Sequence, residues 1–180
     1  NNEGGKLENS GNLNNNSSLK NDGELENKGT VSNNENGNLE NNGTIDNKGN
    51  AEINNGGNFN NNAGSTLNNE SGAKIDGSQP ISNGGDINND GNIKTTVENT
   101  EDGKVDAEVT WTDKDGNEHS GSLKDVLEYL KENPEEASGA KVELNKDVEV
   151  TEPLEVPSGV ELSVPDDKKL SIGENGKLSV

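Results

Sequence analysis

The sequence predicts an all-β protein built as a parallel β-solenoid in two segments, with one short amphipathic helix and a small hairpin between them. The main observation is the spacing of large apolar residues over the first 96 positions. All of them have odd numbers, and successive members are six or eight residues apart. The series is Leu7, Leu13, Leu19, Leu25, Val31, Leu39, Ile45, Ile53, Phe59, Leu67, Ile75, Ile81, Ile87 and Ile93.

An even spacing places these side chains on one face of an extended chain, because strand side chains alternate with period two. A helix would require spacings near three and four, which are missing from this series. One large apolar residue per unit is too few for a β-sandwich. It is enough for a solenoid, in which stacked coils bring these residues together in a thin continuous core.

The second observation is the fixed place of asparagine and glycine in each unit, which reads apolar, any, Asn, any, Gly, any. Asparagine holds the third position in twelve of fourteen units, and Gly77 and Thr95 are the exceptions. Stacked asparagines can form amide ladders, and glycine permits tight corners. The pattern leaves open the handedness and whether three units or fewer close a coil. The eight-residue units are interpreted as bulged corners.

Disorder is the competing interpretation, because hydrophobic residues make up 23% of the chain and the net charge is −20. A disordered chain has no reason to keep one parity across fourteen apolar residues. The register therefore favours the solenoid, with stability that depends on the stacking of neighbouring coils.

The composition changes after Ile93, which predicts four segments. Residues 1–95 form the Asn/Gly-rich solenoid, and residues 96–104 form a polar linker. Residues 105–121 form a β-hairpin, since apolar residues alternate up to Trp111 and Asp115-Gly116 is a turn signal. Residues 122–180 hold a helix and the start of a second β-helix.

The helix is predicted from Ser122 as its N-cap, with Asp125 completing an approximate capping box and Pro134 closing the segment. Its apolar stripe consists of Leu123, Val126, Leu127 and Leu130. Six short strands are then expected, around Val142/Leu144, Val148/Val150, Leu154/Val156, Val160/Leu162/Val164, Leu170/Ile172 and Leu178/Val180.

Residues 122–127, 142–144 and 154–162 together resemble the entry to a right-handed parallel β-helix of the pectate-lyase-like kind. This resemblance covers residues 122–180 and implies that the helix caps the open end of the first coil. The first half resembles Asn/Gly-rich repeats of large bacterial surface and secreted proteins. Both ends of the chain look cut from something longer, so missing targeting signals carry little weight.

Charge and composition restrict the partners. The chain has 35 acidic residues against 15 lysines, with no arginine and no cysteine. This acidic field opposes nucleic acid and anionic membranes, and no apolar run is long enough to span a bilayer. We expect an extracellular or cell-surface location, with glycans or host or matrix proteins as partners.

Few residues suggest a site. His119, the only histidine, has no nucleophile at recognisable spacing and is expected to be an exposed turn residue. Residues 113–118 superficially match a calcium loop but lack glycine at the sixth position and an acid at the twelfth. Residues 84–91 resemble one calcium-binding nonapeptide, with incidental calcium at Asp86 or Asp90 as the open alternative.

Three further candidates have plain structural interpretations. Glu135/Glu136 and Asp166/Asp167 are adjacent in sequence, so they are expected to point apart and not to share a cleft as glycosidase carboxylates do. Trp111 is predicted to anchor the hairpin to the helix stripe, with sugar stacking as the alternative. The lysines are expected in turns and not in a lyase-type centre.

The sequence therefore predicts a non-catalytic structural segment, a stalk or adhesin passenger, with no catalytic, cofactor or metal residues. The alternative is the N-terminal part of a carbohydrate-active β-helix enzyme, a lyase or hydrolase, whose active site lies beyond Val180. An ice-binding face is disfavoured, because the outward positions vary among Glu, Lys, Asp, Asn and Ser.

Overall fold

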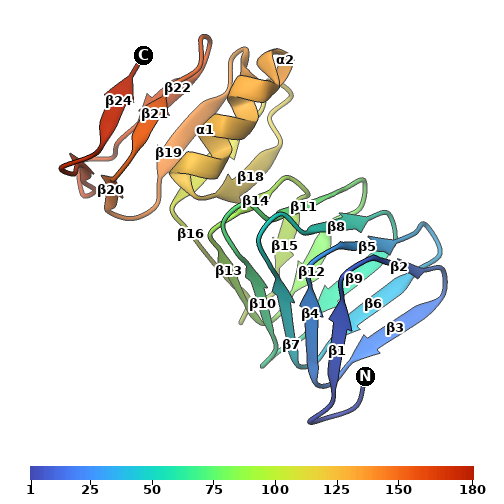
Figure 1. The fold of residues 1–180 in the computed structure, drawn as a ribbon. Coiled ribbons are helices and arrows are strands. Elements are labelled where there is room, and N and C mark those ends of the chain that lie inside the picture. The colour runs from blue at the N-terminus through green and yellow to red at the C-terminus, as the bar shows by residue number, and fades with distance from the viewer. The chain divides into compact units, whose positions relative to one another are not determined.

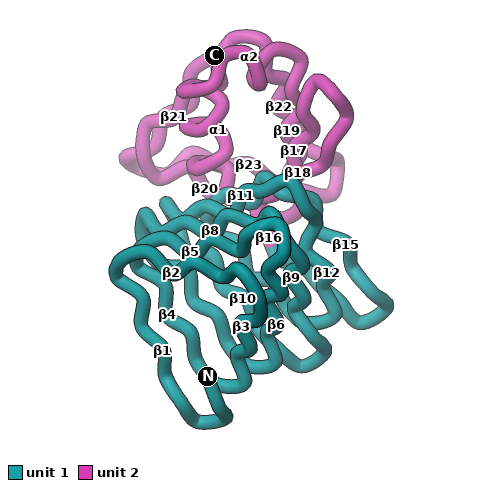
Figure 2. Tube along the Cα trace, turned by 90° about the vertical axis from the view of Figure 1, so that its right-hand side faces the viewer, with its two compact units in different colours: residues 1–106 teal, residues 107–180 magenta.

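The computed structural model describes residues 1–180 and divides them into two compact units, Asn1–Asp106 and Ala107–Val180 (Figure 2). Unit 1 is a parallel β-solenoid, as predicted. Its short strands form three parallel sheets, so three strands close each coil (Figure 1). The number of units per coil, which the spacing left open, is therefore three.

The strands of unit 1 fall into three stacks. The first sheet consists of β1 (Lys6–Asn9), β4 (Glu24–Asn27), β7 (Thr44–Asn47), β10 (Thr66–Asn69), β13 (Asp86–Asn89) and β16 (Lys104–Ala107). The second contains β2 (Asn12–Asn15), β5 (Thr30–Asn33), β8 (Glu52–Asn55), β11 (Lys74–Gly77) and β14 (Asn92–Ile93). The third consists of β3 (Ser18–Asn21), β6 (Asn38–Asn41), β9 (Asn58–Asn61), β12 (Ile81–Asn83) and β15 (Val97–Asn99).

The register stacks equivalent residues of successive coils. Leu7 pairs with Leu25, Leu25 with Ile45, and Ile45 with Leu67, so a coil contains 18, 20 or 22 residues. The length depends on how many eight-residue units the coil contains. The apolar series thus forms three columns, and from Leu25 to Ile93 every member is at most 1% exposed. This confirms the single inward face that the odd parity predicted.

Asparagine forms three ladders inside the coils, and each rung is a hydrogen bond of 2.7–2.9 Å from Nδ2 of one residue to Oδ1 of the next. The ladders join Asn9-Asn27-Asn47-Asn69-Asn89, Asn15-Asn33-Asn55, and Asn1-Asn21-Asn41-Asn61-Asn83-Asn99. Interior members are fully buried. The buried side-chain amides therefore form hydrogen bonds with one another, as buried polar groups require.

Glycine has two separate uses at the corners. In the six-residue units it lets backbones of adjacent coils touch: a Cβ on Gly43 would overlap the carbonyl oxygen of Gly23. In three eight-residue units a glycine adopts a positive φ, 60° at Gly49, 80° at Gly64 and 81° at Gly72. The two extra residues of these units thus lie in the turns, and the strands keep their register.

The boundary of the solenoid differs from the prediction. Residues 96–104 were expected to be a linker, but Val97 pairs with Ile81 in the third sheet and β16 extends the first sheet. Val105 packs against the core of unit 1 and does not belong to the hairpin. The even spacing in fact continues through Val97 and Val105, although the Asn-Gly motif has ended.

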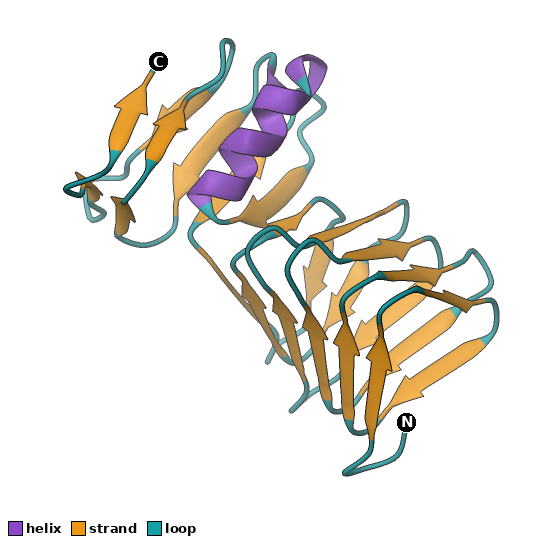
Figure 3. Ribbon diagram, in the orientation of Figure 1, coloured by secondary structure: helices purple, strands orange, loops and turns teal.

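Unit 2 combines a hairpin, two helices and two coils of a second β-helix (Figure 3). The hairpin is β17 (Val109–Thr112) with β18 (Glu118–Gly121), followed by helices α1 (Leu123–Glu132) and α2 (Pro134–Ala137). The coils are formed by β19 (Lys141–Leu144), β20 (Val148–Val150), β21 (Pro153–Glu155), β22 (Glu161–Ser163), β23 (Leu170–Ile172) and β24 (Lys177–Ser179). β19, β20 and β21 pair in parallel with β22, β23 and β24, respectively.

Helix α1 packs on the interior of the first of these coils. Ser122 caps it by accepting from the amide of Asp125 at 3.1 Å, as predicted. Its four stripe residues are buried in one core with Trp111 and Val142. Pro134 ends the segment but also starts α2 at its first position, a helix that the sequence did not reveal.

Candidate functional site

The only histidine lies on a strand of the hairpin, in a position that the sequence did not predict. His119 lies on β18 opposite Trp111 and is 7% exposed, so the expectation of an exposed turn residue was wrong. Its ring packs against the Trp111 indole at a tilt of 41°, with the ring centroids 4.3 Å apart. Nε2 of His119 lies 3.4 Å from a carboxylate oxygen of Asp113.

Asp113 organises this turn through its carboxylate. Oδ1 accepts from the backbone amides of Asp115 and Asn117, each at 2.9 Å, and Oδ2 accepts from the Asn117 side chain at 2.8 Å. Although burial acts to raise it, the pKa of Asp113 lies well below its usual range because these groups and His119 donate to the charged form. The Asp113 carboxylate therefore stabilises the hairpin turn.

Trp111 is fully buried, with Tyr129 of α1 at a ring distance of 5.8 Å. This confirms that it anchors the hairpin to the helix and removes its ring from any sugar-stacking surface. Neither carboxylate pair lines the cleft of unit 2 that is described below. Glu135 and Glu136 lie in α2, and Asp167 pairs with Lys168 at 2.6 Å in a turn.

The calcium-like motifs do not gather ligands. Asp86 lies on β13 and Asp90 in the turn that follows, and both are exposed. Nowhere in residues 1–180 do three or more His, Asp or Glu side chains converge as a metal site would require. Residues 113–117 form the hairpin turn described above.

The strongest electrostatic feature of unit 1 is an outward-facing cluster around Glu26 on β4, which the sequence did not reveal. Its carboxylate lies 2.9 Å from Lys6 Nζ and 3.6 Å from Lys48 Nζ, and it also pairs with Lys28. The side chain is only 7% exposed beneath these lysines. Hydrogen bonds from Lys28 and Lys6 lower the pKa of Glu26 to about 2. The cluster joins three consecutive coils along one sheet.

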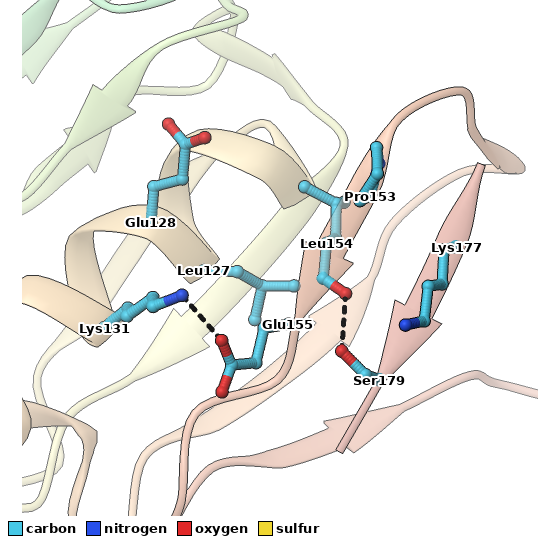
Figure 4. Close-up of a pocket in the computed structure, with 8 residues that line it drawn as sticks. All are labelled: Leu127, Glu128, Lys131, Pro153, Leu154, Glu155, Lys177 and Ser179. Atoms are coloured by element: carbon cyan, nitrogen blue, oxygen red, sulfur yellow. Dashed lines mark hydrogen bonds and ion pairs between the residues drawn. The ribbon is translucent and has the colours of Figure 1, made fainter. Parts of the chain in front are cut away.

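Unit 2 contains a shallow cleft of about 240 Å³ between α1 and strands β21 and β24 (Figure 4). It is lined by Leu127, Glu128, Lys131, Pro153, Leu154, Glu155, Lys177 and Ser179. Lys131 Nζ and a Glu155 oxygen are 2.6 Å apart, which lowers the pKa of that carboxyl, and the Ser179 hydroxyl donates to the Leu154 carbonyl at 3.3 Å. Figure 4 shows the Glu128 carboxylate pointing away from this ion pair.

The cleft can offer an aliphatic floor and the ammonium of Lys177, which has no ion pair. The Glu155 carboxylate in this cleft is kept charged by its ion pair with Lys131, so it is poorly suited to act as a general acid. Lys131, at the end of α1, was not predicted, because its partner Glu155 lies 24 residues away on a strand. Two lysines at the cleft lie on a helix and a strand, contrary to the expectation that the lysines lie in turns.

Comparisons with known proteins supply no relative for this chain. No family model matches it, and neither a curated protein nor a solved structure matches it significantly. None of its helices is long and apolar enough to cross a membrane. What the geometry establishes is a parallel β-solenoid repeat protein with two successive solenoid units.

Proposed function

We propose that the chain is a non-catalytic scaffold segment, a stalk or adhesin passenger of a bacterial extracellular or cell-surface β-solenoid protein. The observation that carries this proposal is the continuous stacking of coils in unit 1, with three apolar columns and three asparagine ladders running along one axis. Each coil adds about 4.8 Å of length, so a short repeat extends the scaffold regularly.

Three further features support this proposal. The outward faces of unit 1 are polar and varied, and charged clusters such as that of Glu26 bind successive coils to each other. A net charge of −20 keeps such a surface soluble and self-repelling. The cleft of unit 2 places the Glu155 carboxylate, in an ion pair with Lys131, beside a hydroxyl that donates to the backbone. Glycans or matrix proteins are the partners proposed for this surface.

A deletion that respects the register tests the scaffold. Residues 25–44 constitute one coil of 20 residues, because Leu25 is stacked on Ile45. Removing them joins Glu24 to Ile45 in phase, so we expect a folded protein shorter by about one strand spacing, 4.8 Å, in small-angle X-ray scattering. Deleting only residues 25–43 breaks the parity and serves as the control, which is expected to lose β-structure in circular dichroism.

The catalytic alternative is tested on the same preparation. The intact chain is incubated with a panel of neutral and acidic polysaccharides, and released reducing ends and unsaturated products are measured. The scaffold proposal predicts no turnover above the buffer control. Turnover that is abolished by Glu155→Gln or Lys177→Ala would contradict it and would place chemistry in the cleft of unit 2.

A further inference from the structure

The cleft of unit 2 lies on the outward side of a pair of strands. Leu154 of β21 and Leu178 of β24 are paired in register and pack against the core of unit 2. Because strand side chains alternate, Glu155 and Lys177 point to the outer face, where both are exposed. These side chains stand perpendicular to the sheet and not along the direction in which coils stack. The cleft is therefore a feature of the side of unit 2.

The cleft has an apolar floor and a small volume. Leu127, Pro153 and Leu154 supply aliphatic surface, and α1 forms the wall beside β21 (Figure 4). The volume of about 240 Å³ is below the roughly 300–1,000 Å³ of pockets that hold drug-sized molecules. A ligand of this cleft is therefore small, of the size of a sugar ring, whose C–H groups can pack on the aliphatic floor.

Three polar groups of the cleft can bind an anion and hydroxyl groups. The ammonium of Lys177, which has no ion pair, extends toward the Ser179 side chain (Figure 4). Oε2 of Glu155 accepts from Lys131 at 2.6 Å, which leaves Oε1 as a fixed acceptor. The Ser179 hydroxyl donates to the Leu154 carbonyl at 3.3 Å, so its oxygen keeps its lone pairs for a further donor. One unpaired cation thus lies beside two acceptors.

The charges around the cleft limit a ligand to one anionic group. Lys131 is already paired with Glu155, so Lys177 alone offers an ammonium without a carboxylate partner. The Glu128 carboxylate lines the same cleft and opposes a second negative charge. The net charge of −20 opposes polyanions at longer range. A ligand with a single carboxylate fits these charges, and a chain of acidic sugars does not.

We propose that this cleft binds one acidic sugar, carrying a single carboxylate, on an otherwise neutral glycan. Lys177 binds the carboxylate, and Glu155 and Ser179 accept hydrogen bonds from the sugar hydroxyls. An aliphatic acid would satisfy Lys177 but would leave both acceptors without donors, and a neutral sugar would leave Lys177 unpaired. The inference rests on the proposed function, because it names the kind of glycan that such a surface scaffold recognises.

The experiment titrates the intact chain with five probes and follows its backbone amides by nuclear magnetic resonance. Sialyllactose and methyl glucuronide each combine one carboxylate with hydroxyls. Lactose has hydroxyls alone, acetate has a carboxylate alone, and oligogalacturonate has a carboxylate on every sugar. We expect an acidic probe to shift residues 153–155 and 177–179 and to bind at least about tenfold more tightly than the other three, because only it makes both kinds of contact.

Two outcomes of this titration would overturn the proposal. One is that neither sialyllactose nor methyl glucuronide shifts these amides. The other is that lactose, acetate or oligogalacturonate binds as tightly as the better acidic probe. The first outcome would remove the site, and the second would assign it to hydroxyls alone, to charge alone or to a polyanion.

A matched pair of variants separates a local contact from an effect of net charge. Lys177→Gln removes the proposed partner of the carboxylate and should weaken binding at least about tenfold. Lys141→Gln removes the same charge from an exposed lysine on β19, outside the cleft, and should leave the affinity unchanged. Circular dichroism checks that both variants are folded. Equal losses of affinity in the two variants would overturn the proposal.

A third variant tests the acceptors without changing the charge. Ser179→Ala removes the hydroxyl of Ser179 and should weaken binding of the acidic probe by about threefold, while acetate binding stays the same. An unchanged affinity for the acidic probe in this variant would contradict the place given to the sugar hydroxyls.

The same samples distinguish failure of this inference from failure of the proposed function. The resonances of each sugar are recorded before and after the titration. Unchanged sugars without binding would overturn the acidic-sugar site and leave the non-catalytic scaffold standing. Resonances of new products would overturn the proposed function and this inference with it. Unchanged sugars with binding at the cleft support both.

Discussion

The side-chain amide of Asn41 donates to Oδ1 of Asn61 at 2.8 Å, across two successive coils and with both residues completely buried. Asn61 in turn donates to Asn83 at 2.8 Å and accepts from the hydroxyl of Ser65 at 2.8 Å. A single residue therefore connects three coils through its side chain alone. The stability of unit 1 therefore depends on contacts between coils.

Replacing Asn61 by alanine should be strongly destabilising. The change leaves Oδ1 of Asn83 and one N–H of Asn41 Nδ2 without their rungs, while Nδ2 keeps its bond to the Thr66 carbonyl, and each unpaired buried group costs about 1–3 kcal/mol. We expect the free energy of unfolding in urea to fall by about 2–5 kcal/mol. The control is Asn60→Ala on the outward face, expected within about 0.5 kcal/mol of the parent. Equal effects of the two changes would contradict the ladder's role.

Replacing Gly43 by alanine should destabilise the protein, although its neighbours in sequence are polar and its φ is not positive. A Cβ there would overlap the Gly23 carbonyl oxygen, so the two coils would have to separate. The control is Gly11→Ala, at the same position of the repeat motif but at the corner between β1 and β2, where the Cβ meets nothing within 4 Å. Thermal unfolding should show a large fall in Tm for Gly43→Ala and almost none for Gly11→Ala. A reversed order would sink the close-approach explanation.

Gly77→Asn completes the repeat motif on paper but should weaken the protein. Gly77 has φ 153°, and a Cβ there would overlap the carbonyl oxygen of Asn55. The asparagine ladder ends at Asn55. Its side-chain amide donates to the carbonyls of Gln79 and Pro80, so it needs no asparagine at position 77. Urea unfolding should show destabilisation by more than about 1 kcal/mol, against little change for Ser78→Asn at the exposed neighbouring position. A stabilised Gly77→Asn variant would refute this.

Acid should remove the contribution of the Glu26 cluster. The pKa of Glu26 is lowered from 4.5 to about 2 in the folded chain, so its stabilising effect is present above pH 4.5 and is lost as pH falls from 4.5 towards 2. Glu26→Gln should therefore flatten the dependence of unfolding free energy on pH in this window. Adding 1 M NaCl should reduce the difference between the two proteins, because salt screens surface pairs. An identical slope for both proteins at low salt would contradict the assignment.

The architecture of unit 1 could be predicted from the sequence because the pattern of apolar residues and asparagines is local and repeated. Odd parity implied one inward face, and asparagine at the third position implied ladders. Parity could not tell three units per coil from fewer, since the pairing of Leu7 with Leu25 depends on how corners close in space. The extension through Val97 is not visible in the Asn-Gly motif, which ends before it, and only the even spacing of apolar residues continues.

The site residues were harder to predict because their partners lie on other coils or elements. His119 is buried because hairpin pairing sets it opposite Trp111. Glu26 is covered by lysines from the coils on both sides, Lys6 and Lys48. Glu155 acquires its partner from α1. In each case a polar residue stands among exposed neighbours in the sequence, and its partner comes from another coil or element in the folded chain.

The most direct test of the whole account is hydrogen exchange of the intact chain, resolved by mass spectrometry over β4 to β13. If the asparagine ladders hold the coils together, the backbone amides of β4 to β13 will exchange far more slowly than those of the exposed turn at residues 113–117. They will also lose protection together in a narrow range of urea. Rapid, unprotected exchange throughout residues 24–89 in native buffer would contradict the solenoid and everything that rests on it.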